Sequence, residues 1–158
     1  MEHPSSEELA RFHRFFAVEA NNEAWQRTLD ELASMDHTAM LNAAHAAAYH
    51  WAVVGTDLNA FRATLLLAHV HAYCGHGEIA WTYAMQCNDF FERHALAGWE
   101  GSFTLMIIAQ AAYVSGRPDQ HRNWYDRAAA HIEAIEDKTD REIVEMTWKN
   151  IPVPTAGE

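Results

Sequence analysis

Apolar residues recur three and four positions apart along almost the whole chain, which is the spacing of one face of an α-helix. Gly, Pro, Asn, Asp or Ser residues stand where these periodic segments begin and end. The pattern predicts a single all-α domain of seven or eight helices over residues 1–150, followed by an extended tail over 151–158. The expected helices cover residues 6–20, 23–34, 38–54, 57–74, 77–94, 99–115, 118–135 and 141–149, with a break at Asn21-Asn22.

Residues 38–73 form the pair of helices around which we expect the others to pack. Gly55 ends the first helix and Thr56 caps the second, so the two should be antiparallel. Met40, Ala44 and Ala47 share one side of the first helix. The second should bury one face, which is made of Leu58, Phe61, Leu65, Ala68 and Ala72.

Polar side chains at helical spacing run along the same pair of helices. With antiparallel packing they predict a polar seam between apolar surfaces, made of Asn42, His45, Tyr49, Arg62 and His69. One interpretation is structural, because buried polar groups usually satisfy one another. The other is a binding site, because clusters of titratable groups mark many functional sites.

Two further helices carry enough apolar residues for a clear prediction. The helix over residues 99–115 is apolar nearly all round, so we expect it to be buried. The helix after Ser5 should turn its large apolar residues inward, namely Leu9, Phe12, Phe16 and Val18.

The composition restricts the partners. The formal net charge is −11 and no basic cluster occurs, which argues against nucleic acid and anionic membranes as partners. The most apolar run, residues 103–114, is too short to span a bilayer. Cys74 and Cys87 lie too far apart on the expected helices for a disulfide, so we expect a reduced, cytoplasmic protein.

The chain is rich in histidine, with 11 residues, and this raises the question of a metal site. Metal-binding helices usually place ligands three or four residues apart, whereas His45 and His50 are five apart and diverge on a helix. A site between helices, such as His45 with His69, is not required by any spacing. Nucleophile elbows and phosphate-binding loops are missing from the sequence. We therefore predict no metal, no cofactor and no catalytic residues.

Two stretches of the chain repeat with an offset of 41 residues. Leu67-Ala68 and Gly75 match Ile108-Ala109 and Gly116, and this pattern resembles the helix-turn-helix unit of tetratricopeptide repeats. The chain has His71 and Ala112 where that family has a tyrosine, and its offset is longer than the family's period. The resemblance covers roughly residues 60–135 and implies stacked antiparallel hairpins. Residues 15–25 and 43–51 also resemble a group of small bacterial all-helical proteins, which implies no activity.

The function expected from this resemblance is that of a non-catalytic helical-repeat module that binds a protein or peptide partner. We also expect the protein to be a homodimer. The alternative is a small-molecule or metal-binding protein, or an enzyme of that kind, that uses the polar seam. The six tryptophans, about one per helix, would support partner binding or the homodimer if they were exposed together.

Overall fold

The computed structural model describes residues 3–30 and 35–155, and in this part of the chain all regular structure is helical. The fold is an all-α single domain, as the sequence predicts. Seven helices follow one another in the described ranges: α1 (Ser6–Leu29), α2 (His37–Val54), α3 (Asp57–Tyr73), α4 (Gly77–Phe91), α5 (Gly98–Val114), α6 (Pro118–Glu133) and α7 (Lys138–Trp148).

Helix starts follow the capping residues that the sequence marks. Ser5 and Thr56 each form a reciprocal capping box, with Glu8 and with Asn59. Asp36 caps α2 by accepting a hydrogen bond from the N–H of Ala39 at 3.0 Å. Pro118 occupies the first turn of α6, where its missing N–H removes no helical bond. The local sequence therefore specifies where these helices begin.

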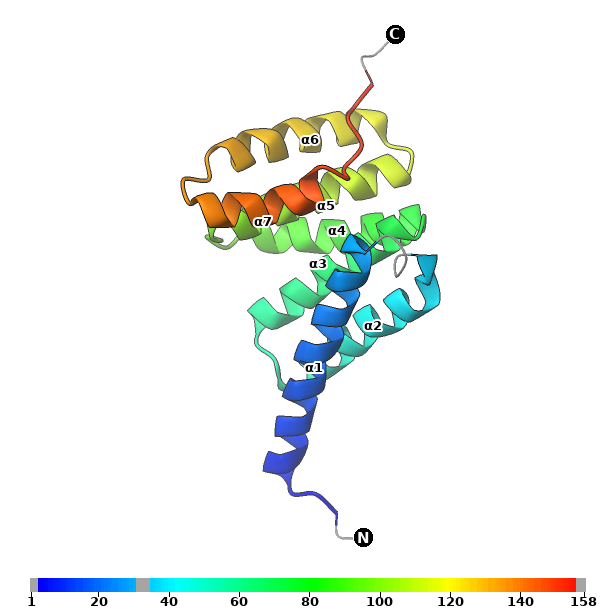
Figure 1. Ribbon diagram of the computed structural model, residues 1–158, viewed down its shortest axis with the longest axis vertical. Helices are drawn as coiled ribbons and strands as arrows, with labels where there is room; N and C mark the ends of the chain where they lie inside the picture. Colours follow the sequence, from blue (N-terminus) through cyan, green and yellow to red (C-terminus); the bar gives the residue numbers. More distant parts are fainter. Residues whose placement is uncertain (1–2, 31–34, 156–158) are drawn as a thin grey trace.

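The helices follow one another along the long axis of the molecule, from α1 and α2 toward one end to α6 and α7 at the other (Figure 1). Each helix packs against its neighbour in sequence from α1 through α6, and α1 also contacts α3, α3 contacts α5, and α5 contacts α7. The odd-numbered helices therefore form a continuous row, with the even-numbered helices beside them. None of the helices in the described ranges combines the length and apolar character needed to cross a membrane.

The core is divided into a large and a small cluster. The large cluster joins α3, α4, α5, α6 and α7, and α5 lies at its centre, with Leu105 to Ala109 buried. The small cluster joins α1, α2 and α3 around Met40 and Leu66. The prediction of a buried helix over residues 99–115 is confirmed, and so is the core face of α3. The centre of the domain is therefore α3 with α5, whereas α2 is buried on one side only.

The 41-residue offset reappears in the geometry of two turns. Gly75 and Gly116 both have positive φ, 78° and 71°, at the same place after a helix end. The backbone hydrogen bonds around the two glycines also match. Gly75 N–H donates to Ala72 O and Gly116 N–H to Tyr113 O, both at 3.1 Å. The next residue donates in each turn as well, His76 N–H to His71 O at 2.8 Å and Arg117 N–H to Ala112 O at 2.9 Å. The α3–α4 and α5–α6 hairpins thus turn in the same way.

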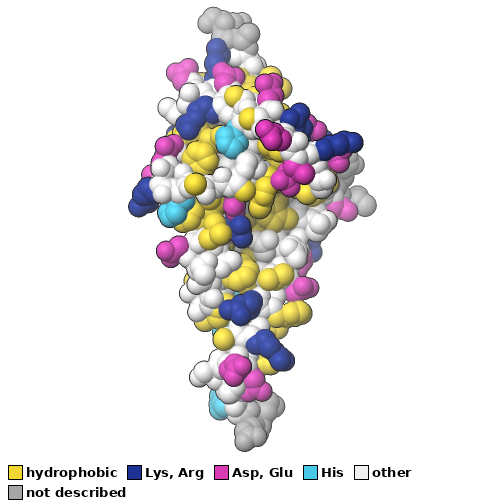
Figure 2. Space-filling view, turned by 90° about the vertical axis from the view of Figure 1, so that its left-hand side faces the viewer, with side chains coloured by type: hydrophobic (Ala, Val, Ile, Leu, Met, Phe, Trp, Pro, Cys, Tyr) yellow, Lys and Arg dark blue, Asp and Glu magenta, His cyan; other side chains and the backbone are white. Residues whose placement is uncertain are grey.

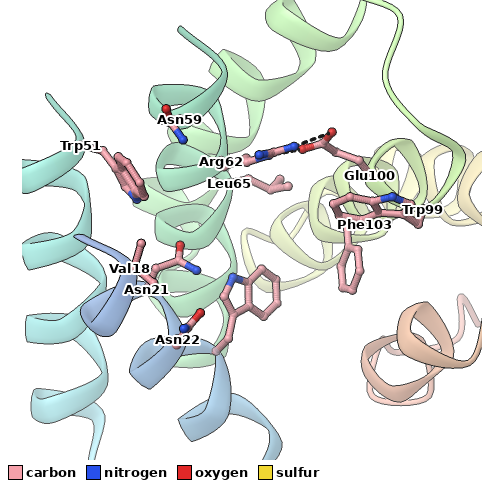
Figure 3. Close-up of a pocket in the computed structure, with 11 residues that line it drawn as sticks. Val18, Asn21, Asn22, Trp51, Asn59, Arg62, Leu65, Trp99, Glu100 and Phe103 are labelled. Atoms are coloured by element: carbon pink, nitrogen blue, oxygen red, sulfur yellow. Dashed lines mark hydrogen bonds and ion pairs between the residues drawn. The ribbon is translucent and has the colours of Figure 1, made fainter. Parts of the chain in front are cut away.

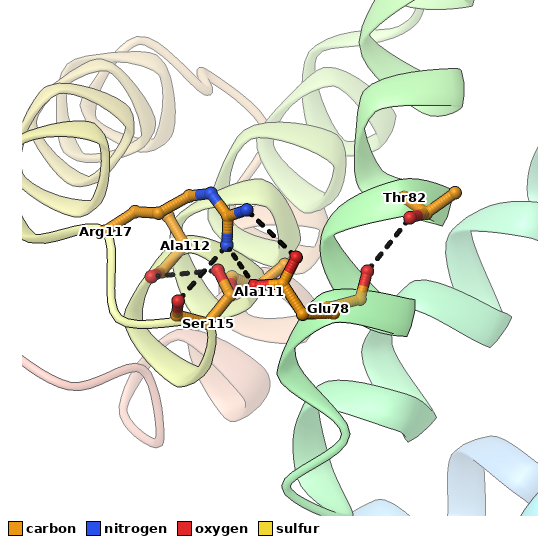
Figure 4. Close-up of polar contacts among 6 residues, drawn as sticks. All are labelled: Glu78, Thr82, Ala111, Ala112, Ser115 and Arg117. Atoms are coloured by element: carbon orange, nitrogen blue, oxygen red, sulfur yellow. Dashed lines mark hydrogen bonds and ion pairs between the residues drawn. The ribbon is translucent and has the colours of Figure 1, made fainter.

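Polar contacts hold these two hairpins together (Figure 4). The guanidinium of Arg117, at the start of α6, donates to both carboxylate oxygens of Glu78 on α4, at 2.8 and 3.1 Å, and to the carbonyl of Ser115 at 3.1 Å. It also lies over the Trp81 ring, 4.9 Å from the centroid. Since this ion pair is partly exposed, its contribution is modest. The ion pair joins the start of α4 to the α5–α6 turn.

Two predictions for α1 are wrong. Leu9, Phe12, Phe16 and Val18 are exposed, and Phe15 is 58% exposed. The buried face of α1 instead consists of small residues, Ala17, Ala24 and Thr28, because it packs closely against the alanines of α2.

The helix also continues through Asn21-Asn22. The low helix propensity of asparagine costs only about 0.7 kcal/mol per residue, and burial of Ala17 and Ala24 on either side outweighs it. The molecule narrows toward the first turns of α1 (Figure 2).

The expected helix end near Ser34 lies outside the described residues. Beyond α7, Ile151 is buried in the large cluster, and the carbonyl of Thr155 accepts a hydrogen bond from Arg122 at 2.8 Å.

Candidate functional site

A cleft of about 420 Å³ lies between α1, α2, α3 and α5. Its walls come from residues far apart in the sequence (Figure 3). The lining residues are Val18, Asn21, Asn22 and Trp25 of α1, Trp51 of α2, Asn59, Arg62 and Leu65 of α3, and Trp99, Glu100 and Phe103 of α5. The cleft is therefore a product of the tertiary packing of four helices.

Helical spacing explains why each helix contributes its set. Residues 18, 21, 22 and 25 are spaced so that they share one face of α1, and residues 59, 62 and 65 share one face of α3. The sequence alone shows that these residues share helix faces. It does not predict which face lines a cleft, because the cleft depends on how α1 packs against α3.

Aromatic rings form the apolar walls of the cleft. Trp25 meets Phe103 edge to face at 5.5 Å between centroids, and Phe103 meets Trp99 in the same manner at 6.4 Å. Trp25 also stacks at 4.8 Å on the buried ring of His69, which lies behind the wall. Trp51 stands on the opposite side of the cleft and packs against neither core cluster.

One ion pair supplies the charge on the described lining of the cleft. Arg62 of α3 donates through Nε to Glu100 Oε1 at 2.5 Å and through Nη2 to Glu100 Oε2 at 3.3 Å. The Glu100 side chain is only 7% exposed, whereas that of Arg62 is 44% exposed. The hydrogen bond to Glu100 raises the pKa of Arg62, so the guanidinium stays charged at any relevant pH. The pair neutralises the buried carboxylate and leaves an edge of the guanidinium accessible.

The structure does not bring the five residues of the predicted seam together. Arg62 lines the cleft, and His69 is buried with its Nδ1 2.9 Å from Gln110 Oε1. His45 lies against His71 instead of His69, with 3.1 Å between their Nε2 atoms. Tyr49 is 64% exposed beside His13 and His50, and Asn42 is exposed. The physical reason is that α2 packs near Leu67 and Val70 of α3, while His69 faces α1 and α5.

The structure does form a chain of histidines that sequence spacing did not indicate. His71 lies between His45 and His76, and each of its ring nitrogens is 3.1 Å from a neighbouring imidazole nitrogen. Burial, and then the charges of His45 and His76, lower the pKa of His71 to about 4. In residues 3–30 and 35–155, no three His, Cys, Asp or Glu side chains are grouped so as to hold a metal ion.

The two thiols are poor nucleophiles in this fold. Burial raises the pKa of Cys87 to about 12 and also raises that of Cys74. Both cysteines are free. Because the thiolate is the reactive form, neither residue has the environment of a catalytic cysteine.

No family model, no curated protein and no solved structure matches this chain. The resemblance to tetratricopeptide repeats therefore stays a prediction, supported by the matching hairpin turns and by the row of odd-numbered helices.

Proposed function

We propose that this protein is a non-catalytic binding protein whose cleft holds a short extended segment of a partner polypeptide. The observation that carries the proposal is the cleft itself, which is lined by three tryptophans and Phe103 together with the neutralised Arg62–Glu100 pair. Tryptophan and arginine are the residues most enriched among those that dominate binding energy in protein interfaces.

The polar groups of the cleft fit a polypeptide better than a purely apolar ligand. Asn21, Asn22 and Asn59 bring side-chain amides to its lining. An amide carries both donors and acceptors, so it can pair with a peptide group. Helical repeats also present extended surfaces to peptides.

Catalysis has less support in this cleft. The charged side chains on its described lining are Arg62 and Glu100, and each is engaged by the other. General acid–base chemistry requires a side chain within reach of the reacting proton, and the hydrogen bonds between Arg62 and Glu100 already occupy both carboxylate oxygens.

Selection from a library of short random peptides tests the proposal. Enriched peptides should bind the wild-type protein and lose affinity by at least about tenfold in Trp51→Ala, because a large aromatic wall is removed. Tyr49→Ala is the matched control, since Tyr49 is exposed on the same helix and does not line the cleft. Equal losses in the two variants, or no enriched peptide, would count against the cleft.

A small organic molecule is the second candidate ligand. The volume of about 420 Å³ favours it, because small-molecule sites commonly measure about 300–1,000 Å³. Native mass spectrometry and elemental analysis of protein purified without a chelator would reveal a bound molecule or metal. A stoichiometric organic ligand displaced in Trp51→Ala would move the assignment to this candidate.

The homodimer expected from the sequence stays a prediction. Sedimentation velocity over a range of protein concentrations would show whether a second copy binds.

A further inference from the structure

The walls of the cleft offer hydrogen-bond donors that have no partner within the described residues. Trp25, Trp51 and Trp99 each carry one indole N–H, and none of the three donates a hydrogen bond in residues 3–30 and 35–155. None of these nitrogens is among the fully buried unpaired atoms of the described residues, so each indole N–H is at least partly exposed. The residues that line the cleft therefore carry three indole N–H donors without a partner among the described residues.

The acceptors of the same cleft are largely occupied. Both carboxylate oxygens of Glu100 accept from Arg62. The side-chain oxygen of Asn59 accepts from the backbone N–H and the hydroxyl of Thr56, each at 3.0 Å, which leaves only its NH₂ group to face a ligand. Asn21 and Asn22 are the lining residues that still offer carbonyl oxygens. The cleft is thus rich in donors and poor in acceptors.

A ligand for this cleft must supply acceptors and flat apolar surface. An ordinary extended peptide brings one N–H for each carbonyl, and some of those N–H groups would face the aromatic walls unpaired, which weakens binding. Proline contributes a carbonyl without an N–H. Proline-rich segments hold a polyproline II conformation with no internal hydrogen bonds, so their carbonyls point outward and little ordering is required on binding.

We propose, on the basis of the proposed function, that the partner segment is proline-rich and binds in the polyproline II conformation with its rings against Trp25, Trp51 and Trp99. Recognition of such segments by aromatic-lined grooves follows from the same chemistry of flat rings and carbonyl acceptors. The charges on the described lining cancel, so the segment needs no charged residue inside the cleft. The protein as a whole carries −11, which disfavours acidic flanks on the peptide.

The test compares two labelled synthetic peptides by fluorescence anisotropy on the intact chain: a proline-repeat peptide with neutral flanks, and a matched peptide with alanine at every proline. The proline peptide should bind at least about tenfold more tightly. Trp51→Ala should weaken binding of the proline peptide by a similar factor. Trp51→Phe should weaken it less, because phenylalanine keeps an aromatic ring; the loss that remains reflects the missing N–H donor. Tyr49→Ala should bind as the wild type does, and circular dichroism should show that all variants are folded.

The outcomes separate this inference from the proposed function. If the alanine peptide binds as well as the proline peptide, or if library peptides without proline bind in a manner that depends on Trp51, the cleft binds peptides but the proline assignment is overturned. If neither synthetic peptide nor any library peptide shows binding that depends on Trp51, both the assignment and the proposed function fail.

Discussion

His69 of α3 and Gln110 of α5 hydrogen-bond to each other at 2.9 Å, and they occupy equivalent positions in the two hairpins, 41 residues apart. His69 Nδ1 donates to the Gln110 side-chain oxygen, and its Nε2 is buried without a partner among the described residues. Burial, only partly offset by this hydrogen bond, lowers the pKa of His69 to about 4. A neutral imidazole therefore supports Trp25, which stacks on it from the cleft side.

Removal of Gln110 should destabilise the domain. In Gln110→Leu the Nδ1–H of His69 loses its acceptor, so the free energy of unfolding measured by urea denaturation should fall by about 1–3 kcal/mol. The double variant His69→Leu, Gln110→Leu should lose less than the sum of the two single variants, because it leaves no unpaired polar group. Strict additivity would show that the pair is not energetically coupled.

The domain should lose stability between about pH 6.5 and pH 4. The pKa values of His69 and His71 are both lowered to about 4 in the folded protein from the usual histidine value of 6.5. As the pH falls through 6.5 the unfolded chain binds protons that the folded chain does not, so stability is fully present above pH 6.5 and is lost on acidification. The shift corresponds to about 3 kcal/mol per histidine at most.

Urea denaturation at several pH values checks this expectation. A His69→Leu variant should show a shallower fall in stability toward pH 4, since one of the two groups no longer titrates. A stability that does not change between pH 7 and pH 4.5 would contradict it.

Loss of the Arg62 side chain should destabilise the protein through Glu100. In Arg62→Met the carboxylate keeps its buried position without its partner, and breaking a buried pair costs about 3–5 kcal/mol. Because Arg62 is partly exposed and water can reach the site, we expect a loss of about 1–3 kcal/mol. The double variant Arg62→Met, Glu100→Gln should recover part of this loss in thermal unfolding. A double variant no more stable than Arg62→Met would refute the role of the unpaired charge.

Gly77 should not tolerate a larger residue, although Gly98 should. A Cβ at Gly77 would lie 2.5 Å from the backbone oxygen of Val114 and 2.7 Å from the Cα of Ser115, so α4 would have to move away from α5. We expect Gly77→Ala to cost about 1–3 kcal/mol. At Gly98 the nearest atom to an added methyl group is a flexible carbon of Ile135 at 3.9 Å, so Gly98→Ala should be neutral or slightly stabilising. Equal effects of the two substitutions in thermal unfolding would disprove the close contact at Gly77.

The two thiols should react with a thiol reagent in a fixed order. Cys74 is partly buried, whereas Cys87 is buried with a pKa raised to about 12. Cys74 should therefore react slowly in the folded protein and Cys87 only on unfolding. Mass spectrometry of a Cys74→Ser variant would isolate Cys87, and rapid labelling of that variant in the absence of denaturant would contradict the burial of the thiol.

The helices and most of their ends follow from the sequence alone. Periodic apolar residues, capping residues such as Ser5, Asp36 and Thr56, and glycines such as Gly75 and Gly116 act within a few residues of where they stand, so their effect is readable locally. The buried face of α3 and the burial of α5 were predictable for the same reason.

Which helix faces meet depends on tertiary packing. α1 has large apolar residues on one side and alanines on another, and close packing against α2 selected the alanines, which left Phe12 and Phe15 exposed. The sequence spacing of His45 and His69 is compatible with a contact between them. In the structure, however, the packing of α2 places His45 against His71, and the packing of α5 places Gln110 against His69. The cleft between Trp25, Trp51 and Trp99 exists because four helices pack in one particular arrangement, and a pattern along a single helix cannot specify the distance or orientation of another.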